Sequence, residues 1–196
     1  MKTSSNKKST ETIALGAILT ALVIVLQSVA SFFPGLFGPF SAAVALIPII
    51  IGCALCDTKV GAWLGFVFAL VVLFTGSAAL FWTFDIFGTI VTVVVKGVAC
   101  GTAAGLIYSV LKKYNDTVAV FAASIACPVV NTSVFLLGCS IFFMKHAQAI
   151  AQMISSEATG MELFVGMALA NFLFELGINV VLAPVIVRLL KIKRKQ

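Results

Sequence analysis

The stretch that decides the fold class is MELFVGMALANFLFELGINVVLAPVIVRLL, residues 161–190. Nearly all of its side chains are apolar, and the few charged ones are spread along it. A helix that crosses a bilayer needs about 20 consecutive, mostly apolar residues. Residues 161–190 are therefore predicted to form a transmembrane helix.

The rest of the chain has the same character. Of its 196 residues, 61% are apolar and 10% are charged, whereas a soluble domain is about half apolar and about a quarter charged. A soluble fold of this size could not bury so much apolar surface. The composition excludes a soluble enzyme, a nucleic-acid-binding domain and a disordered chain, and it predicts contact with membrane lipid.

Five further apolar runs are separated from one another by turns or polar segments. The six expected helices cover residues 12–33, 41–56, 60–75, 85–111, 117–144 and 161–190. A signal peptide is the alternative for the first run, but that run is longer than the 7–15 residues typical of a signal h-region. We therefore expect an all-α membrane protein, a six-transmembrane-helix bundle over residues 12–190.

The positive charges test this count through the positive-inside rule. With six spans, eleven of the thirteen cations fall on one side: Lys2, Lys7, Lys8, Lys59, Lys112, Lys113, Arg188, Lys191, Lys193, Arg194 and Lys195. Lys145 falls on the other side, and Lys96 lies inside a span. The tails at 1–11 and 191–196, and so both the N- and C-termini, are predicted to be cytoplasmic in a bacterial plasma membrane.

Two ionisable residues, Lys96 and Glu175, are predicted at membrane depth, where charges are costly and usually functional. Lys96 follows Asp85 by roughly 16 Å of helix, and Glu175 follows Met161 by roughly 21 Å. Both helices run inward from the outside, so the two groups could lie at similar depth. They are candidates for a substrate site, with a structural ion pair between helices as the alternative.

Three asparagines extend this candidate site. Asn171 and Asn179 flank Glu175 at a spacing of four, which places all three on one helix face, and Asn131 follows Pro128 in another helix. Such a face points to a cavity or to interhelical hydrogen bonds. Trp82 is a further candidate at the outer rim, where tryptophan is also common as an interfacial residue.

Small residues recur along the first helix. Ala14, Ala17 and Ala21 are spaced three and four apart, beside Gly16. Small residues at this spacing let another helix approach closely. The pattern fits packing inside the bundle and docking of another membrane protein equally well.

Together these features resemble an S component, the substrate-binding subunit of an energy-coupling factor (ECF) vitamin transporter. The resemblance is carried by LGAILTA at 15–21, which matches an A-x-x-x-A motif, by the apolar loop at 32–40, and by PVVNTSVFLLG at 128–138. It covers essentially the whole chain. It implies that Ala17 and Ala21 contact a transmembrane coupling subunit that works with two ATPases, and that loop 32–40 covers the vitamin site.

The resemblance also implies binding of a vitamin from outside and its delivery inward. The chain has no G-x-x-x-x-G-K-[ST] motif of its own, so it is expected not to be an enzyme, and no cofactor is expected. Pantothenate is the preferred substrate, because Lys96 could bind its carboxylate while the asparagines and Glu175 bind its amide and hydroxyls. Riboflavin, folate and other vitamin precursors remain open.

Other functions compete with this one. A stand-alone secondary carrier for a small organic anion could use Lys96 and Glu175. An intramembrane enzyme is poorly supported, because the one histidine, His146, is placed in a loop and one carboxylate lies deep. Cys53 and Cys56 form an isolated C-x-x-C inside an apolar run, which favours core packing over a metal site. A purely structural subunit is the last alternative.

Overall fold

A computed structural model of the chain describes residues 2–32, 41–154, 156–158 and 160–193, and for residues 2–9, 41–43, 170 and 193 it describes the backbone alone. Within those ranges the protein is helical. The α-helices are α1 (Lys2–Phe32), α3 (Ser41–Leu55), α4 (Thr58–Phe74), α5 (Ala79–Trp82), α6 (Ile86–Leu111), α7 (Asp116–Gly138), α8 (Ala147–Met153) and α9 (Met161–Lys193). A π-helical turn, η2 (Cys139–Phe143), and a 3₁₀ turn, η3 (Met144–His146), join α7 to α8.

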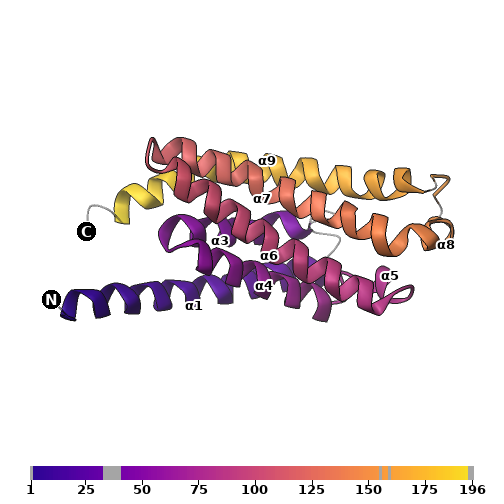
Figure 1. The fold of residues 1–196 in the computed structure, drawn as a ribbon, viewed down its shortest axis with the longest axis horizontal. Helices are drawn as coiled ribbons and strands as arrows, with labels where there is room; N and C mark the ends of the chain where they lie inside the picture. The colour runs from indigo at the N-terminus through magenta and orange to yellow at the C-terminus, as the bar shows by residue number, and fades with distance from the viewer. Residues whose placement is uncertain (1, 33–40, 155, 159, 194–196) are drawn as a thin grey trace.

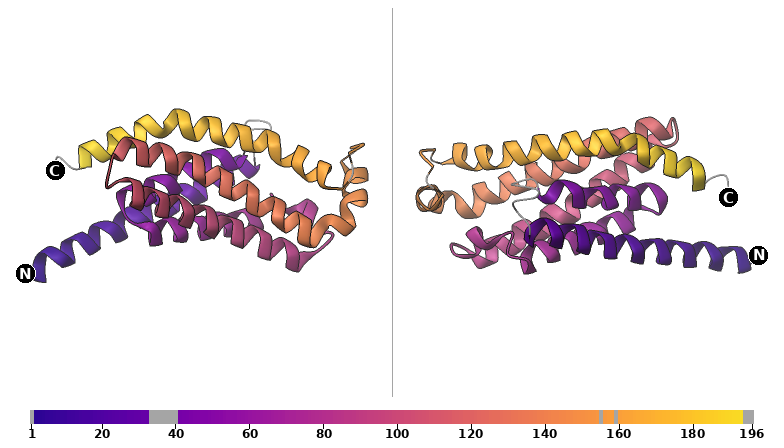
Figure 2. Two further views of the ribbon diagram at one scale, coloured as in Figure 1. Left: turned by 45° about the horizontal axis from the view of Figure 1, so that its top comes forward. Right: turned by 180° about the vertical axis from the view of Figure 1, so that it is seen from behind.

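The helices form an elongated bundle in which α6 packs against both α4 and α7 (Figure 1). Helix α9 packs on α7 and α3, and α1 packs on α3 and α4. The start of α1 and the end of α9 lie at the same end of the bundle, and α1 extends beyond its neighbours there (Figure 2). This places the basic ends of the chain together.

Four helical segments of the described chain are long and apolar enough to cross a membrane: Thr10–Phe32, Ile86–Leu111, Asp116–Met153 and Met161–Ile192. Helices α3 and α4 have 15 and 17 residues, fewer than the roughly 20 of a full span. The prediction of an all-helical membrane fold is confirmed. Six spans with cytoplasmic termini remain a prediction, since two of the six apolar helices are short.

Polar residues in the turns fix where three helices begin. The carboxylate of Asp57 accepts a hydrogen bond from the backbone N–H of Val60 at 2.8 Å, and Asp85 accepts one from Gly88 at 2.8 Å. The Asn115 side chain caps α7 in the same way. Such caps satisfy backbone donors that the first helical turn leaves unpaired.

Several boundaries differ from the sequence-based expectation. Helix α1 begins at Lys2, so the basic residues before the apolar run continue the same helix. The fifth apolar run leaves the α-helical state at Gly138, and the segment at 145–160 contains the short α8. Most of the predicted loop over the vitamin site, residues 33–40, lies outside the described residues.

Helices α4 and α6 meet along a line of glycines, the glycine seam, formed by Gly61 and Gly65 on α4 and by Gly97 and Gly101 on α6. A Cβ atom added at Gly65 would collide with the Gly97 carbonyl oxygen, and one at Gly97 would collide with the Gly65 carbonyl. A Cβ atom at Gly101 would collide with the Gly61 carbonyl oxygen, whereas one at Gly61 would collide first with the Cys53 thiol. The two backbones therefore touch, and this contact fixes the position of Lys96, the residue just before Gly97.

Candidate functional site

A partly open cavity of about 280 Å³, the main cavity, lies between α1, α4, α5, α6, α7 and α9. The residues that line it combine aromatic rings with polar side chains: Gln27, Phe68, Val72, Ser77, Phe81, Lys96, Asn131, Thr132, Phe135, Met167, Ala168 and Asn171. Three of the predicted site residues, Lys96, Asn131 and Asn171, are brought together in this one cavity. They come from three different helices.

Lys96 reaches this cavity between two aromatic rings. Its ammonium nitrogen lies 5.5 Å from the ring centroid of Phe135 and 6.0 Å from that of Phe68. Both are within the range of cation–π attraction, which is worth more in a desolvated site. In the described part of the chain no carboxylate forms an ion pair with Lys96, so its ammonium donors remain available.

Glu175 lies behind the cavity wall and is fully buried. Its carboxylate accepts hydrogen bonds from the side-chain amide of Asn131 at 3.2 and 3.3 Å and from that of Asn171 at 2.6 Å. The sequence allowed a structural ion pair between Lys96 and Glu175, but in the structure two side-chain amides bind the Glu175 carboxylate instead.

These hydrogen bonds orient the two asparagines. An ionised carboxylate only accepts, so both amide nitrogens must face Glu175 and both amide oxygens must face elsewhere. The oxygens Oδ1 of Asn131 and Asn171 are buried without a hydrogen-bond partner, as is Oε1 of Gln27. Buried polar atoms in native proteins are normally hydrogen-bonded. Each of these three cavity-lining residues therefore keeps a buried acceptor that no group of the described chain satisfies.

Asn179 and Trp82 do not line this cavity. The Asn179 amide donates to the backbone oxygen of Glu175 on its own helix at 2.7 Å. Trp82 ends α5 and packs against the central apolar core. Helix spacing correctly places Asn179 on the face of Glu175, but its amide is used within the helix.

Some lining residues lack any signal in the sequence. Ser77 sits in a turn and joins Ser31 and Thr75 through hydroxyl hydrogen bonds of 2.7 to 3.4 Å. Phe68 and Phe135 are two of seventeen phenylalanines, and nothing local distinguishes them. The glycines at 61, 65, 97 and 101 do carry a signal, because their spacing of four on two helices is typical of close helix contacts.

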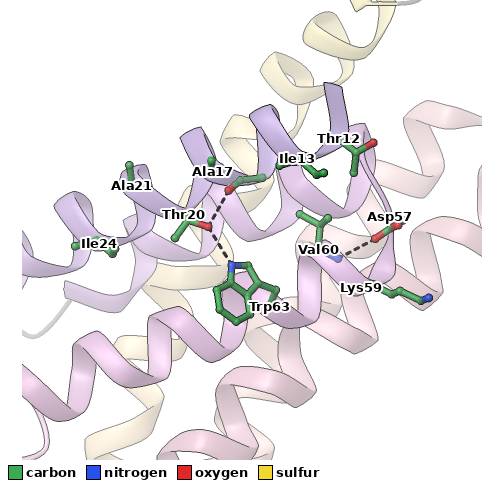
Figure 3. A pocket seen from close by; sticks show the side chains of 11 residues that line it. Thr12, Ile13, Ala17, Thr20, Ala21, Ile24, Asp57, Lys59, Val60 and Trp63 are labelled. Atoms are coloured by element: carbon green, nitrogen blue, oxygen red, sulfur yellow. Dashed lines mark hydrogen bonds between the residues drawn. The ribbon is translucent and has the colours of Figure 1, made fainter. Parts of the chain in front are cut away.

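A second hollow is a surface groove of about 670 Å³ between α1 and α4 (Figure 3). Ala17 and Ala21 are exposed and line it. Trp63 of α4 donates a hydrogen bond of 3.2 Å to Thr20 of α1, which in turn donates to the Gly16 backbone oxygen (Figure 3). The predicted docking pair is thus on an open face of the bundle.

Neither hollow has the composition of a metal site. Among the described residues, no group of three or more His, Cys, Asp or Glu side chains is placed to hold a metal ion. Cys53 is buried and donates to the Gly101 backbone oxygen at 3.3 Å, beside the glycine seam. The main cavity is suited instead to an organic molecule that carries a negative charge and hydrogen-bond donors.

Comparison with known families identifies the chain's family. The family model for the substrate-specific component of ECF transporters matches residues 11–187. The chain belongs to this family. As an ECF substrate-specific component it is a transport protein of the membrane that binds a substrate, and not a member of an enzyme family. Comparisons with curated proteins and with solved structures gave no match.

Proposed function

We propose that this ECF substrate-specific component binds pantothenate from the outside and delivers it inward with a coupling subunit and two ATPase subunits. The observation that carries the proposal is the main cavity itself. It holds one unpaired lysine ammonium and several buried amide oxygens. The sequence-based preference for pantothenate is supported by the chemistry of this set.

The ammonium group of Lys96 favours a ligand that carries a negative charge. A cation buried among apolar residues is costly unless a negative partner approaches it. Glu175 is held by Asn131 and Asn171, so the ligand supplies that partner. The carboxylate of pantothenate meets this need, and a charge-assisted hydrogen bond in a dry pocket is stronger than a neutral one.

The side-chain amide oxygens of Gln27, Asn131 and Asn171 favour a ligand with hydrogen-bond donors. Pantothenate has two hydroxyls and an amide N–H, which match Gln27, Asn131 and Asn171. The cavity volume of about 280 Å³ falls just below the range of about 300–1,000 Å³ that is usual for ligand pockets. This volume accommodates a small vitamin such as pantothenate.

The energy for transport comes, in this proposal, from partner subunits. The chain has no phosphate-binding loop in its sequence. Ala17 and Ala21 are exposed in the groove between α1 and α4, where a helix of a coupling subunit could approach closely. Their exposure supports docking over internal packing.

The first test is mass spectrometry of small molecules released by denaturing the protein, purified in mild detergent without added vitamin. One stoichiometric equivalent of pantothenate is expected. Release of another vitamin would overturn the substrate but not the class of function. If nothing is released, reconstitution in liposomes decides: uptake by this chain without ATPases would replace the proposal with a secondary carrier.

A further inference from the structure

Lys96 borders a second cavity besides the main one. This smaller cavity, the side branch, has a volume of about 60 Å³ and is lined by Val72, Ser77, Ala78, Phe81, Thr89, Thr92, Val93, Lys96, Phe135 and Phe143. Five of these residues, Lys96 among them, also line the main cavity. The ammonium group therefore lies on the wall that the two spaces share.

The side branch differs from the main cavity in its polar groups. Thr92 is 5% exposed and its hydroxyl is buried without a hydrogen-bond partner. The Thr89 hydroxyl donates to the Asp85 backbone oxygen at 2.6 Å, so its proton is already used. Among the described residues, Thr92 and Lys96 thus line the branch with donor groups that have no hydrogen-bond or ion-pair partner, and no carboxylate lines it.

The main cavity is lined by the same Lys96 ammonium and by the Ser77 and Thr132 hydroxyls, and it adds acceptors. Its unpartnered atoms are the side-chain oxygens of Gln27, Asn131 and Asn171, and their own nitrogens are held by other groups, by Ser31 for Gln27 and by Glu175 for the asparagines. The buried amide oxygens without a partner therefore belong to residues of the main cavity, the unpartnered hydroxyl belongs to a residue of the side branch, and Lys96 lines both spaces.

We propose, resting on the function above, that this division fixes the orientation of the substrate. A compact carboxylate occupies the side branch and is bound by Lys96 and Thr92. The hydroxyl- and amide-bearing remainder of the molecule lies in the main cavity against Gln27, Asn131 and Asn171. Thr92 is then a specificity-determining residue that selects a carboxylate over a neutral end group of similar size.

The dimensions of the branch fit this assignment. A water molecule takes up about 30 Å³ of liquid, so the branch has room for a group about as large as a carboxylate. Thr92 of this branch is packed against Gly138 of α7, where a Cβ atom would collide with the Thr92 side chain. The absence of a side chain at Gly138 lets α7 pack against Thr92.

The test compares two ligands and two threonine variants by isothermal titration calorimetry on the full-length purified protein. Pantothenate is compared with pantothenol, in which a hydroxymethyl group replaces the carboxylate. Thr92→Val removes the free hydroxyl and keeps the side-chain shape, and Thr89→Val is the matched control in the same branch. Thr92→Val is expected to weaken pantothenate binding about tenfold, the usual effect of losing a hydrogen bond to a charged group.

The test depends on how each variant changes the affinity for pantothenate relative to that for pantothenol. Pantothenol affinity should stay the same in Thr92→Val, and Thr89→Val should bind both ligands as the wild type does. Thr92→Ser, which keeps the hydroxyl, should retain pantothenate affinity. If Thr92→Val does not fold, Thr92→Ala removes the same hydroxyl without adding bulk.

The outcomes separate the two proposals. Wild-type protein that binds neither ligand overturns the proposed function and this orientation with it. Wild-type protein that binds pantothenate, with Thr92 variants that lose nothing or lose both ligands equally, overturns the orientation alone, because the carboxylate would then lie elsewhere.

Discussion

Helix α4 meets one neighbour through the glycine seam and another through an open groove, although small residues at a spacing of four mark both contacts. Toward α6, Gly61 and Gly65 are buried against Gly97 and Gly101, backbone on backbone. Toward α1, Ala17 and Ala21 remain exposed beside a groove of about 670 Å³. The same pattern is closed on one face and open on the other.

The difference lies in what separates the helices. On the α1 side, Trp63 is 54% exposed and its indole donates a hydrogen bond to Thr20, so this contact includes a large side chain at the groove. On the α6 side Gly65 and Gly97 meet backbone on backbone, and the small Cys53 thiol of α3 lies beside Gly61 and donates to the Gly101 backbone oxygen. Because lipid gives helices no hydrophobic drive to associate, close packing and polar contacts decide which faces join. A pattern of small residues therefore allows a helix face to pack closely, but it does not determine which helix packs there.

The largest effect on stability is expected from adding a side chain at a glycine of the seam. Gly65→Ala places a methyl group on the Gly97 carbonyl, and overpacking of this kind costs about 1–3 kcal/mol or more. The free energy of unfolding in detergent, from denaturant titration, should fall by that amount. Gly177→Ala on α9 is the control, since a Cβ there meets nothing within 4 Å. Equal stability of the two variants would contradict the seam.

Removing the positive charge of Lys96, next to the seam, should weaken substrate binding while the helices remain packed. Lys96→Met keeps a long apolar side chain but loses the charge, and binding of pantothenate should weaken about a hundredfold or more, as for a buried charge-assisted contact. Affinity is measured by calorimetry, and Lys145→Met, at an exposed position, should bind normally. Unchanged affinity in Lys96→Met would remove Lys96 from the site.

Filling the groove should affect transport and leave substrate binding intact. With Ala17→Leu and Ala21→Leu combined, uptake of labelled pantothenate by cells that also express an ECF coupling module should fall at least about tenfold, because the partner helix can no longer approach closely. Ala14→Leu is the matched control, as Ala14 is exposed on α1 but does not line the groove. Normal uptake in the double variant would favour another docking face.

The smallest effect on stability is expected from removing the hydrogen bond between Trp63 and Thr20, which joins α4 to α1 at the groove. Trp63→Phe removes the hydrogen bond to Thr20 and keeps an aromatic ring, so the free energy of unfolding should fall by less than about 1.5 kcal/mol. The melting temperature in detergent measures this. A loss as large as that of Gly65→Ala would mean that the α1 contact, too, is part of the core.

The sequence by itself determined the helical membrane class. Apolar runs must form helices in lipid, because every backbone N–H and C=O must be satisfied within the segment. The capping residues Asp57, Asp85 and Asn115 can likewise be found locally, as polar residues in short turns. The family resemblance in the sequence is confirmed by the match over residues 11–187.

Part of the candidate site is also predictable from the sequence. Helix geometry places residues four apart on one face, and the hydrogen bonds of Asn171 and Asn179 to Glu175 within α9 follow that spacing. Helical rise likewise predicts the depth of Lys96 along its helix. These inferences depend on distances along one helix, which the sequence contains.

The tertiary structure alone decided which groups meet across helices. It joined Glu175 of α9 to Asn131 of α7 and left Lys96 between two phenylalanine rings. It also buried the glycines of α4 and α6 while leaving Ala17 and Ala21 exposed. The physical reason is that spacing along a helix is fixed by local geometry, whereas the partner of each face depends on how all the helices pack together.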